Sequence, residues 1–348
     1  MALQFNKLGD SGLHVAPVIV GCMSYGDKRW APWVLEDEEE IMKLLKKCYD
    51  SGLRTFDTAD VYSNGRSEIL LKKFMDRYNI ARNKIQILTK LYFPFDELDP
   101  SSQVWRGQNS YPLYEFINAQ GLSRGHILEA VEASVRRLGT HIDVLQIHRL
   151  DPAIPKKEIM RALNDVVEKG YTRYIGASSM KAVEFVELQY LAELNGWHKF
   201  ISMQSYYNLI AREDERELIP FCKSNELGKV GLIPWSPIAT GVLARPVGAE
   251  SDSGRNKDAD ILKTLLGFDN LSDADKTTVN RVEEVAKKHG VSMAIISTAW
   301  VISKGCNPIV GLNSEKRIDE AVAAALFQIP EEDVKYLEEA YVPKRSIV

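Results

Sequence analysis

The sequence lacks the short motifs that mark several common classes of enzyme. No two of its 22 glycines are separated by a single residue, so the G-x-G-x-x-G dinucleotide fingerprint is missing, and so is a Walker A loop. The six histidines form no H-E-x-x-H motif, and none stands at metal-binding spacing from a cysteine. A G-x-S-x-G nucleophile motif is missing too. These absences argue against a Rossmann-type nucleotide site, a metal site and an acyl-transfer site, and we expect no metal.

Cysteines and long apolar runs are scarce as well. The four cysteines form no C-x-x-C pair, which favours a reducing compartment. No segment reaches the roughly 18 unbroken apolar residues of a membrane helix, and the first residues lack the apolar core of a secretory signal. The 44 basic and 48 acidic residues leave a net charge of only -4. We therefore expect a cytoplasmic protein that binds neither nucleic acid nor membranes.

What the sequence does contain is a repeated change from helical to strand-like patterning. In residues 36–52 the apolar side chains recur at helical spacing, and Gly52 follows where a left-handed residue would end the helix. A short apolar run comes next. Five more stretches of this kind end in glycine, namely at Gly139, Gly170, Gly196, Gly290 and Gly305.

The apolar runs predict eight buried parallel strands. They are short, rich in Val and Ile, and do not alternate with polar residues, which is typical of strands covered on both faces. Eight strand–helix units in 348 residues predict one domain, residues 1–348, with a (β/α)8 TIM-barrel fold of the α/β class. The predicted strands are 17–22, 54–58, 85–90, 143–148, 173–178, 200–204, 230–235 and 307–311.

Four segments lie outside this repeat. Residues 3–17, with G-D-S-G as a turn, predict an N-terminal β-hairpin that caps the barrel bottom. Long loops follow strands 3 and 7, at 91–125 and 236–272, and a tail covers 329–348. Loops this long inside a compact domain are usually functional. These two loops follow strands, so we expect them at the C-terminal face, where barrel enzymes keep their active sites.

Four chemically distinct side chains stand at the ends of three consecutive predicted strands. Asp57 ends strand 2, and Tyr62 follows five residues later; Lys90 ends strand 3 and His148 ends strand 4. A free tyrosine has a pKa of about 10, too high for efficient proton transfer near neutral pH. An adjacent ammonium lowers that pKa, and a carboxylate keeps the ammonium charged. We therefore expect Asp57 to hold Lys90, Lys90 to tune Tyr62 as a general acid, and His148 to orient a carbonyl oxygen.

Asp57 and Tyr62 lie in a segment, F-D-T-A-D-V-Y-x5-E, that resembles the D-T-A-x-x-Y signature of the aldo-keto reductases. Nearly the whole chain resembles this family, and most of all its fungal aryl-alcohol dehydrogenase and versiconal hemiacetal acetate reductase branch. The resemblance implies a (β/α)8 barrel that reduces aldehydes or ketones to alcohols, reversibly, with NADP(H) bound without a Rossmann fold. The family's catalytic Asp, Tyr, Lys and His correspond to Asp57, Tyr62, Lys90 and His148, so activity is implied as well as fold.

The resemblance also implies cofactor contacts, position by position. Ser178 and Gln204 would bind the nicotinamide carboxamide, and Trp235 would stack on its ring. Ser314 predicts a helix N-cap, and a helix N-terminus attracts phosphate. Arg317 corresponds to the family's 2′-phosphate contact and Glu320 to its adenine contact, which favours NADP(H) over NAD(H). The remaining implied cofactor-binding residues are Gly21, Ser179, Ser236, Pro237, Ile238, Gly241 and Gly311.

Aromatic side chains in the segments after strands 1 and 3 predict the substrate pocket. Tyr25, Trp30, Tyr92 and Trp105 are its expected residues, with Phe93 nearby, and they suit apolar or aromatic carbonyl compounds. Two alternatives remain open at this stage. The potassium-channel β subunits share the fold and would make the chain a redox-sensing NADPH-binding module, and a barrel of this kind could also isomerise sugar phosphates. The sequence does not indicate an oligomeric state.

Overall fold

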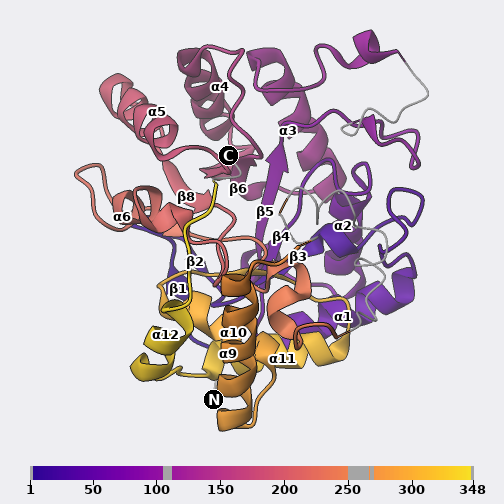
Figure 1. Ribbon diagram of the computed structural model, residues 1–348. Helices are drawn as coiled ribbons and strands as arrows, with labels where there is room; N and C mark the ends of the chain where they lie inside the picture. The colour runs from indigo at the N-terminus through magenta and orange to yellow at the C-terminus, as the bar shows by residue number, and fades with distance from the viewer. Residues whose placement is uncertain (1–2, 105–111, 250–265, 267–269, 346–348) are drawn as a thin grey trace.

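The protein folds as a barrel of parallel strands enclosed by helices (Figure 1). The computed structural model describes residues 3–104, 112–249, 266 and 270–345. All eight predicted barrel strands are confirmed, with ends that shift by a few residues. They are β3 (Ile19–Gly21), β4 (Thr55–Asp57), β5 (Gln86–Leu91), β6 (Ile142–Ile147), β7 (Thr172–Ser178), β8 (Phe200–Gln204), β9 (Gly231–Leu232) and β10 (Ile309–Gly311).

The strands pair in parallel in the order β10-β3-β4-β5-β6-β7-β8-β9. The last gap closes through a parallel bridge between Trp235 and Ile309, with the Ile309 amide donating to the Pro234 carbonyl at 2.9 Å. Strand β9 is shorter than predicted. Its hydrogen bonds to the β8 side nevertheless continue past Leu232, since the Ile233 amide donates to the Met203 carbonyl at 3.0 Å and the Trp235 amide donates to the Ser205 carbonyl at 2.9 Å.

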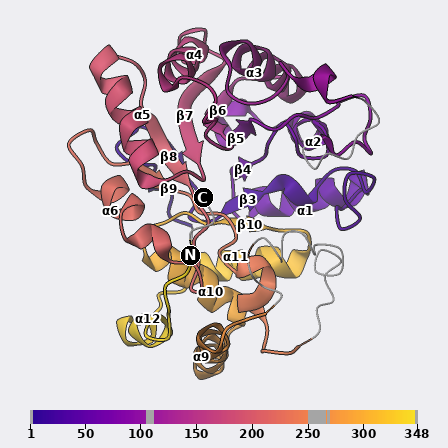
Figure 2. The same ribbon diagram turned by 45° about the horizontal axis from the view of Figure 1, so that its top comes forward.

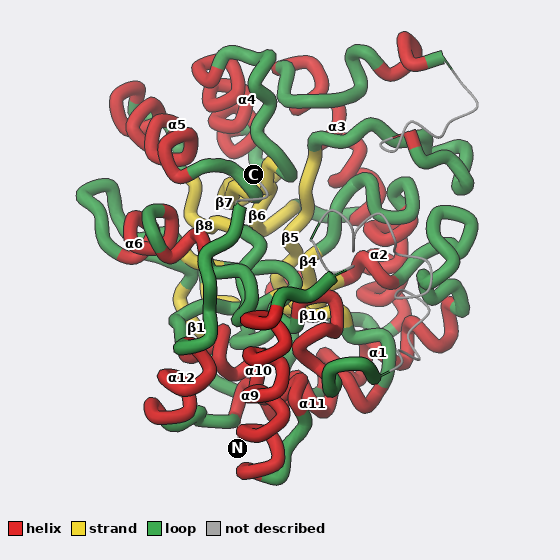
Figure 3. The backbone as a smooth tube through the Cα atoms, in the orientation of Figure 1, coloured by secondary structure: helices red, strands yellow, loops and turns green. Residues whose placement is uncertain are grey.

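Helices surround the strands in a continuous outer layer (Figures 2 and 3). Helix α1 (Glu38–Asp50) illustrates how the sequence specifies them: Asp37 caps its N-terminus, the apolar positions are buried, and Gly52 follows with φ of 88°. The others are α2 (Arg66–Arg77), α3 (Arg124–Leu138), α4 (Lys156–Glu168), α5 (Ala182–Asn195), α6 (Leu218–Lys223), α9 (Asp273–His289), α10 (Met293–Ser303), α11 (Glu315–Leu326) and α12 (Glu331–Glu338).

The predicted N-terminal hairpin is confirmed and closes one end of the barrel. Strands β1 (Asn6–Lys7) and β2 (His14–Val15) are antiparallel. Leu8 and Val15 are fully buried and pack in one cluster with residues of the barrel strands, among them Leu88 and Val144. Burial of this apolar surface holds the hairpin in place. Gly9 has φ of 60°, and a Cβ there would lie 2.4 Å from the Lys229 carbonyl oxygen, so this turn requires glycine.

The segments outside the repeat contain more regular structure than their sequences indicate. The loop after β5 includes a 3-10 turn at Leu113–Phe116, and the loop after β9 begins with another at Ala239–Ala244. The tail contains α12, a helix that the sequence pattern does not predict. None of the helices in the described ranges is long and apolar enough to cross a membrane.

Candidate active site

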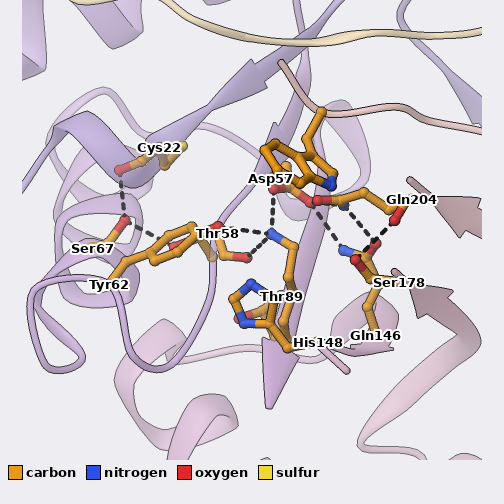
Figure 4. Close-up of polar contacts among 12 residues, drawn as sticks. Cys22, Asp57, Thr58, Tyr62, Ser67, Thr89, Gln146, His148, Ser178 and Gln204 are labelled. Carbon is orange, nitrogen blue, oxygen red and sulfur yellow. Dashed lines mark hydrogen bonds and ion pairs between the residues drawn. The ribbon is translucent and has the colours of Figure 1, made fainter. Parts of the chain in front are cut away.

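The barrel brings the four predicted catalytic side chains together at the C-terminal ends of adjacent strands (Figure 4). Asp57 is the last residue of β4, Lys90 lies in β5, and His148 follows β6 directly. Tyr62 comes from the turn between β4 and α2. Neighbouring parallel strands end at the same face of the barrel, so strand order alone places these groups in one region.

A buried ion pair forms the centre of the site. Lys90 Nζ lies 2.5 Å from Asp57 Oδ1 and also donates to the Thr58 carbonyl at 2.9 Å. Their side chains are 0% and 3% exposed. Lys90 Nζ further donates to the Tyr62 hydroxyl at 3.4 Å. The expected chain from carboxylate to ammonium to phenol is therefore present as contacts between these three residues.

Electrostatics favour a charged lysine and a neutral histidine. Burial alone would lower the pKa of Lys90, but its interactions with the Asp57 carboxylate and the Tyr62 oxygen outweigh this effect, and the pKa lies above its ordinary value. Burial, together with the positive charges of Lys90 and Arg149, lowers the pKa of His148 well below its ordinary value. A neutral imidazole can hydrogen-bond a carbonyl oxygen without adding a cation beside Lys90.

Two glutamines complete the environment of Asp57, and only one of them was predicted. Gln204 Nε2 donates to Asp57 Oδ2 at 3.0 Å and to Gln146 Oε1 at 2.8 Å. Gln146 Nε2 donates to the same Asp57 oxygen at 3.0 Å. Figure 4 shows these glutamines on the opposite side of Asp57 from Tyr62 and His148. The sequence analysis did not identify Gln146. Its position could have indicated it, because a residue two positions before His148 on a buried strand lies on the same face of the sheet as His148.

Aromatic rings surround Tyr62 and His148. The His148 ring lies edge-on to Tyr62 and to Phe93, with centroid distances of 5.9 and 5.0 Å. The Trp30 ring is 6.4 Å from that of Tyr62. Tyr92 is half-buried and packs edge-on against Phe93 at 5.0 Å.

Two residues of the predicted substrate pocket need separate comment. Tyr25 does not line the site: its ring packs in the main hydrophobic core, and its hydroxyl donates to the Leu312 carbonyl. The pocket assignment of Tyr25 was therefore wrong. Trp105 lies outside the described residues.

The predicted nicotinamide contacts gather beside Gln204. Ser178 Oγ donates to the Gln204 carbonyl at 2.8 Å and lies 3.2 Å from Ser179 Oγ. Trp235 Nε1 donates to Ser179 Oγ at 3.3 Å. Both amide hydrogens of Gln204 are used within the protein, and its Oε1 accepts no hydrogen bond from the described residues, so this oxygen suits a carboxamide NH2 group.

The loop after β9 begins with a strained, left-handed backbone turn. Ser236, Ala239, Thr240 and Gly241 all have φ between 49° and 101°. The Ala239 amide donates to the Ser236 carbonyl at 3.0 Å and the Thr240 amide donates to Ser236 Oγ at 2.9 Å, so both amides are used inside the turn. Three of the four are not glycine, and such strain is concentrated at functional sites. Pro237 and Ile238 lie in the same turn, and the Ile238 carbonyl accepts from the Gly241 amide at 2.8 Å.

Glycines leave room at the floor of this region. Gly21 of β3 pairs with Gly311 of β10 on one side and with Asp57 of β4 on the other. A Cβ at Gly21 would lie 3.2 Å from the Val310 carbonyl oxygen. Arg245, which the sequence reading missed, donates from Nε to the Gly241 carbonyl at 2.9 Å. It places a guanidinium against the same turn.

Helix α11 presents a positive N-terminus. Ser314 caps it by accepting from the Arg317 amide, and Arg317 Nη1 donates to Asn313 Oδ1 at 2.6 Å. Two acids near this end, Glu315 and Asp319, are both paired with Lys47 of α1. Within the described chain neither Arg317 nor Lys316 forms an ion pair with a carboxylate. Cations at a helix N-terminus are unfavourable without an anion, so this end fits a phosphate. Glu320 is half-buried on the next turn.

A second aspartate of the D-T-A-D segment, Asp60, is buried without a cationic partner. Its Oδ1 accepts from the Val61 amide at 2.6 Å, whereas Oδ2 accepts no hydrogen bond from the residues the structure describes. Burial, with the nearby Glu68 carboxylate adding to it, raises the pKa of Asp60 well above its ordinary value. Burial at this position therefore favours the protonated form of Asp60 over the carboxylate.

Asp60→Asn is accordingly expected to leave the free energy of unfolding near pH 7 unchanged within about 1 kcal/mol, or higher. The folded Asp60 holds its proton to a higher pH than the unfolded one, whose pKa is about 4, so wild-type stability falls as pH rises from the unfolded to the folded pKa. The variant lacks this loss. Urea unfolding of the wild type and the variant at about pH 5 and pH 8 measures this difference. A variant less stable than the wild type by several kcal/mol at the higher pH would mean that Asp60 is ionised in the folded protein.

Within the described residues, no set of three or more His, Cys, Asp or Glu side chains is arranged to hold a metal ion. The site instead combines an acid–amine–phenol chain with an aromatic wall and, next to it, a strained left-handed backbone turn.

Comparison with known proteins agrees with this geometry. A family model described as "Aldo/keto reductase family" matches residues 17–342. The chain is 56% identical to "Putative aryl-alcohol dehydrogenase AAD16" of Saccharomyces cerevisiae, over 98% of this chain and 97% of that protein. It is 54% identical to versiconal hemiacetal acetate reductase of Aspergillus parasiticus, over 98% of each chain. An aldo-keto reductase of Fusarium vanettenii is 45% identical over 98% of this chain and 92% of its own length.

Proposed function

The chain belongs to the aldo/keto reductase family and is an oxidoreductase, and on that premise we propose that residues 1–348 form one domain that reduces aldehydes or ketones with NADPH. The product is an alcohol, the reaction is reversible, and Tyr62 is the general acid. The observation that carries this proposal is the continuous contact from Asp57 through Lys90 to the Tyr62 hydroxyl.

The proposed chemistry divides between the cofactor and the protein. Bound NADPH supplies the hydride that reduces the carbonyl carbon. The Tyr62 hydroxyl donates its proton to the carbonyl oxygen, and the Lys90 ammonium 3.4 Å away stabilises the phenolate that remains. Asp57 keeps Lys90 charged and in place. The neutral His148 ring, 5.9 Å from that of Tyr62 by centroid, hydrogen-bonds and orients the same carbonyl oxygen.

The residues present fit a dinucleotide. Ser178, the free Gln204 oxygen and Trp235 would hold the nicotinamide, and the left-handed turn at 236–241 would receive the pyrophosphate. Arg317 and Lys316 would pair with a 2′-phosphate, because their charges are not neutralised by described carboxylates. This favours NADPH over NADH. The four cysteines are free and buried, which suits the reducing conditions of the cytoplasm.

Arg317→Ala is expected to weaken NADPH binding by tenfold or more, about 1.4 kcal/mol, while the dissociation constant of NADH changes little. NADH lacks the 2′-phosphate and so acts as the internal control. Fluorescence titration of both cofactors measures the effect. Equal weakening of both would assign Arg317 to fold stability, and no change in either would remove it from the cofactor site.

We further propose that the preferred substrates are aromatic carbonyl compounds. Phe93 and Trp30 flank the Tyr62 and His148 rings, and flat apolar walls of this kind favour aryl groups. The names of the relatives point the same way, since one is an aryl-alcohol dehydrogenase by name.

A panel of aromatic and aliphatic aldehydes and keto esters, followed by consumption of NADPH and NADH in parallel, tests the function. We expect turnover with NADPH and higher kcat/KM for aryl than for short aliphatic aldehydes. Tight NADPH binding with no turnover of any carbonyl compound would contradict reductase activity and favour a binding role.

A further inference from the structure

The first part of the loop after β5, residues 92–104, is tied to the catalytic side of the barrel by specific contacts. We name these residues the rim segment. It carries Phe93, whose ring packs edge-on against His148 at 5.0 Å, so the position of the rim segment sets one wall of the carbonyl site.

One buried guanidinium joins the rim segment to the barrel. Arg137 of α3 is 3% exposed, and its Nη1 donates to Glu97 Oε2 of the rim segment at 2.9 Å. Its Nε donates to Glu68 Oε2 of α2 at 2.7 Å, where Glu68 is fully buried. The same guanidinium lies over the Phe95 ring, 5.3 Å from the centroid. A planar fork with several donors can make all these contacts at once, which a lysine ammonium cannot.

The other end of this connection reaches the catalytic lysine. Glu68 Oε1 accepts from Thr89 Oγ1 at 2.5 Å, and Thr89 immediately precedes Lys90 in β5. Helices α2 and α3 lie side by side around the barrel (Figure 2). Arg137 therefore spans from the strand that carries Lys90 to the segment that carries Phe93.

The chain near Tyr62 is shaped to admit this side chain. Gly65 has φ of 87°, and a Cβ there would lie 2.7 Å from Arg137 Cδ. Asn64, with φ of 51°, donates from Nδ2 to the carbonyls of Asp99 and Ser102 at 2.8 and 2.9 Å. The turn that follows Tyr62 thus both makes room for Arg137 and holds the rim segment directly.

We propose that Arg137 is a positioning residue for substrate specificity, holding the rim segment through Glu97 and Phe95 so that Phe93 stays against His148. This inference rests on the proposed function, because the wall matters only if a carbonyl compound binds beside His148. Glu97 is the side chain that can be removed without exposing a buried charge, since it is 40% exposed and Arg137 keeps Glu68 as its buried partner.

Glu97→Ala is the test. We expect KM for an aryl aldehyde such as benzaldehyde to rise about fivefold, with kcat and the NADPH dissociation constant within about twofold of wild type. KM for propanal, too small to depend on the aromatic wall, should not change. Hydrogen exchange of the backbone amides of residues 92–104, measured by mass spectrometry, should become faster because the segment loses one of its ties.

Two matched variants serve as controls. Leu98→Ala removes the neighbouring side chain, which is 92% exposed, and should change neither KM nor exchange. Glu97→Gln keeps an acceptor oxygen for Arg137 and should restore most of the wild-type KM. In a protein that turns over benzaldehyde, an unchanged KM or unchanged exchange in Glu97→Ala overturns the inference. If the wild type reduces no carbonyl compound, the proposed function fails. In that case, unchanged hydrogen exchange in Glu97→Ala would separately show that Glu97 does not hold the rim segment.

Discussion

Tyr62→Phe is expected to lower kcat for aldehyde reduction by about two to four orders of magnitude, the contribution typical of a general acid. The substitution removes only the hydroxyl that receives a hydrogen bond from Lys90 at 3.4 Å. The ring can keep its contacts with Trp30 and His148. Because the lost group acts on the carbonyl oxygen, the NADPH dissociation constant should stay within about twofold.

Steady-state kinetics with an aryl aldehyde and a separate NADPH titration measure the two effects. Tyr78→Phe is the matched control, since it removes a hydroxyl from a half-buried tyrosine that follows helix α2, outside the residues assigned to the site, and it should leave kcat within about twofold. Retained turnover in Tyr62→Phe would exclude Tyr62 from the acid role. A large loss of NADPH binding would point to a structural role for the hydroxyl.

Lys90→Met is expected to abolish turnover and also to lower the free energy of unfolding by about 3–5 kcal/mol, because it leaves the Asp57 carboxylate buried without its cation. The pair is 2.5 Å apart and almost fully buried. The two Gln side chains still donate to Asp57 Oδ2, but amides do not replace the charge. The double variant Lys90→Met/Asp57→Asn should recover part of the stability, since it removes the unpaired charge.

Urea unfolding of the wild type, both single variants and the double variant measures this coupling. The pH dependence has a defined sign. The pKa of Lys90 is raised in the folded protein, so its contribution to stability is complete below the ordinary lysine pKa of about 10.4 and is lost as pH rises through the folded value. If the two single-variant losses in free energy of unfolding simply add in the double variant, the Lys90–Asp57 interaction does not stabilise the fold.

The sequence by itself determined the barrel and the identity of the groups at its centre. Helix-ending glycines such as Gly52 and Gly139 have the expected left-handed conformation, because helix patterning and termination are local. The positions of Asp57, Lys90 and His148 at strand ends followed from the same local patterns, since parallel strands of one barrel end at one face.

Only the tertiary structure decided which side chains touch. Three contacts join segments from different parts of the chain. They are the hydrogen bond from Gln146 to Asp57, the one from the buried Tyr25 to Leu312, and the ion pairs of Arg137 with Glu68 and Glu97. The direction of a side chain in a long loop depends on the surfaces that pack against it. The hydrophobic periodicity of the sequence does not predict those surfaces. The chemistry at the strand ends could therefore be inferred from the amino-acid order, whereas the walls around it required the folded chain.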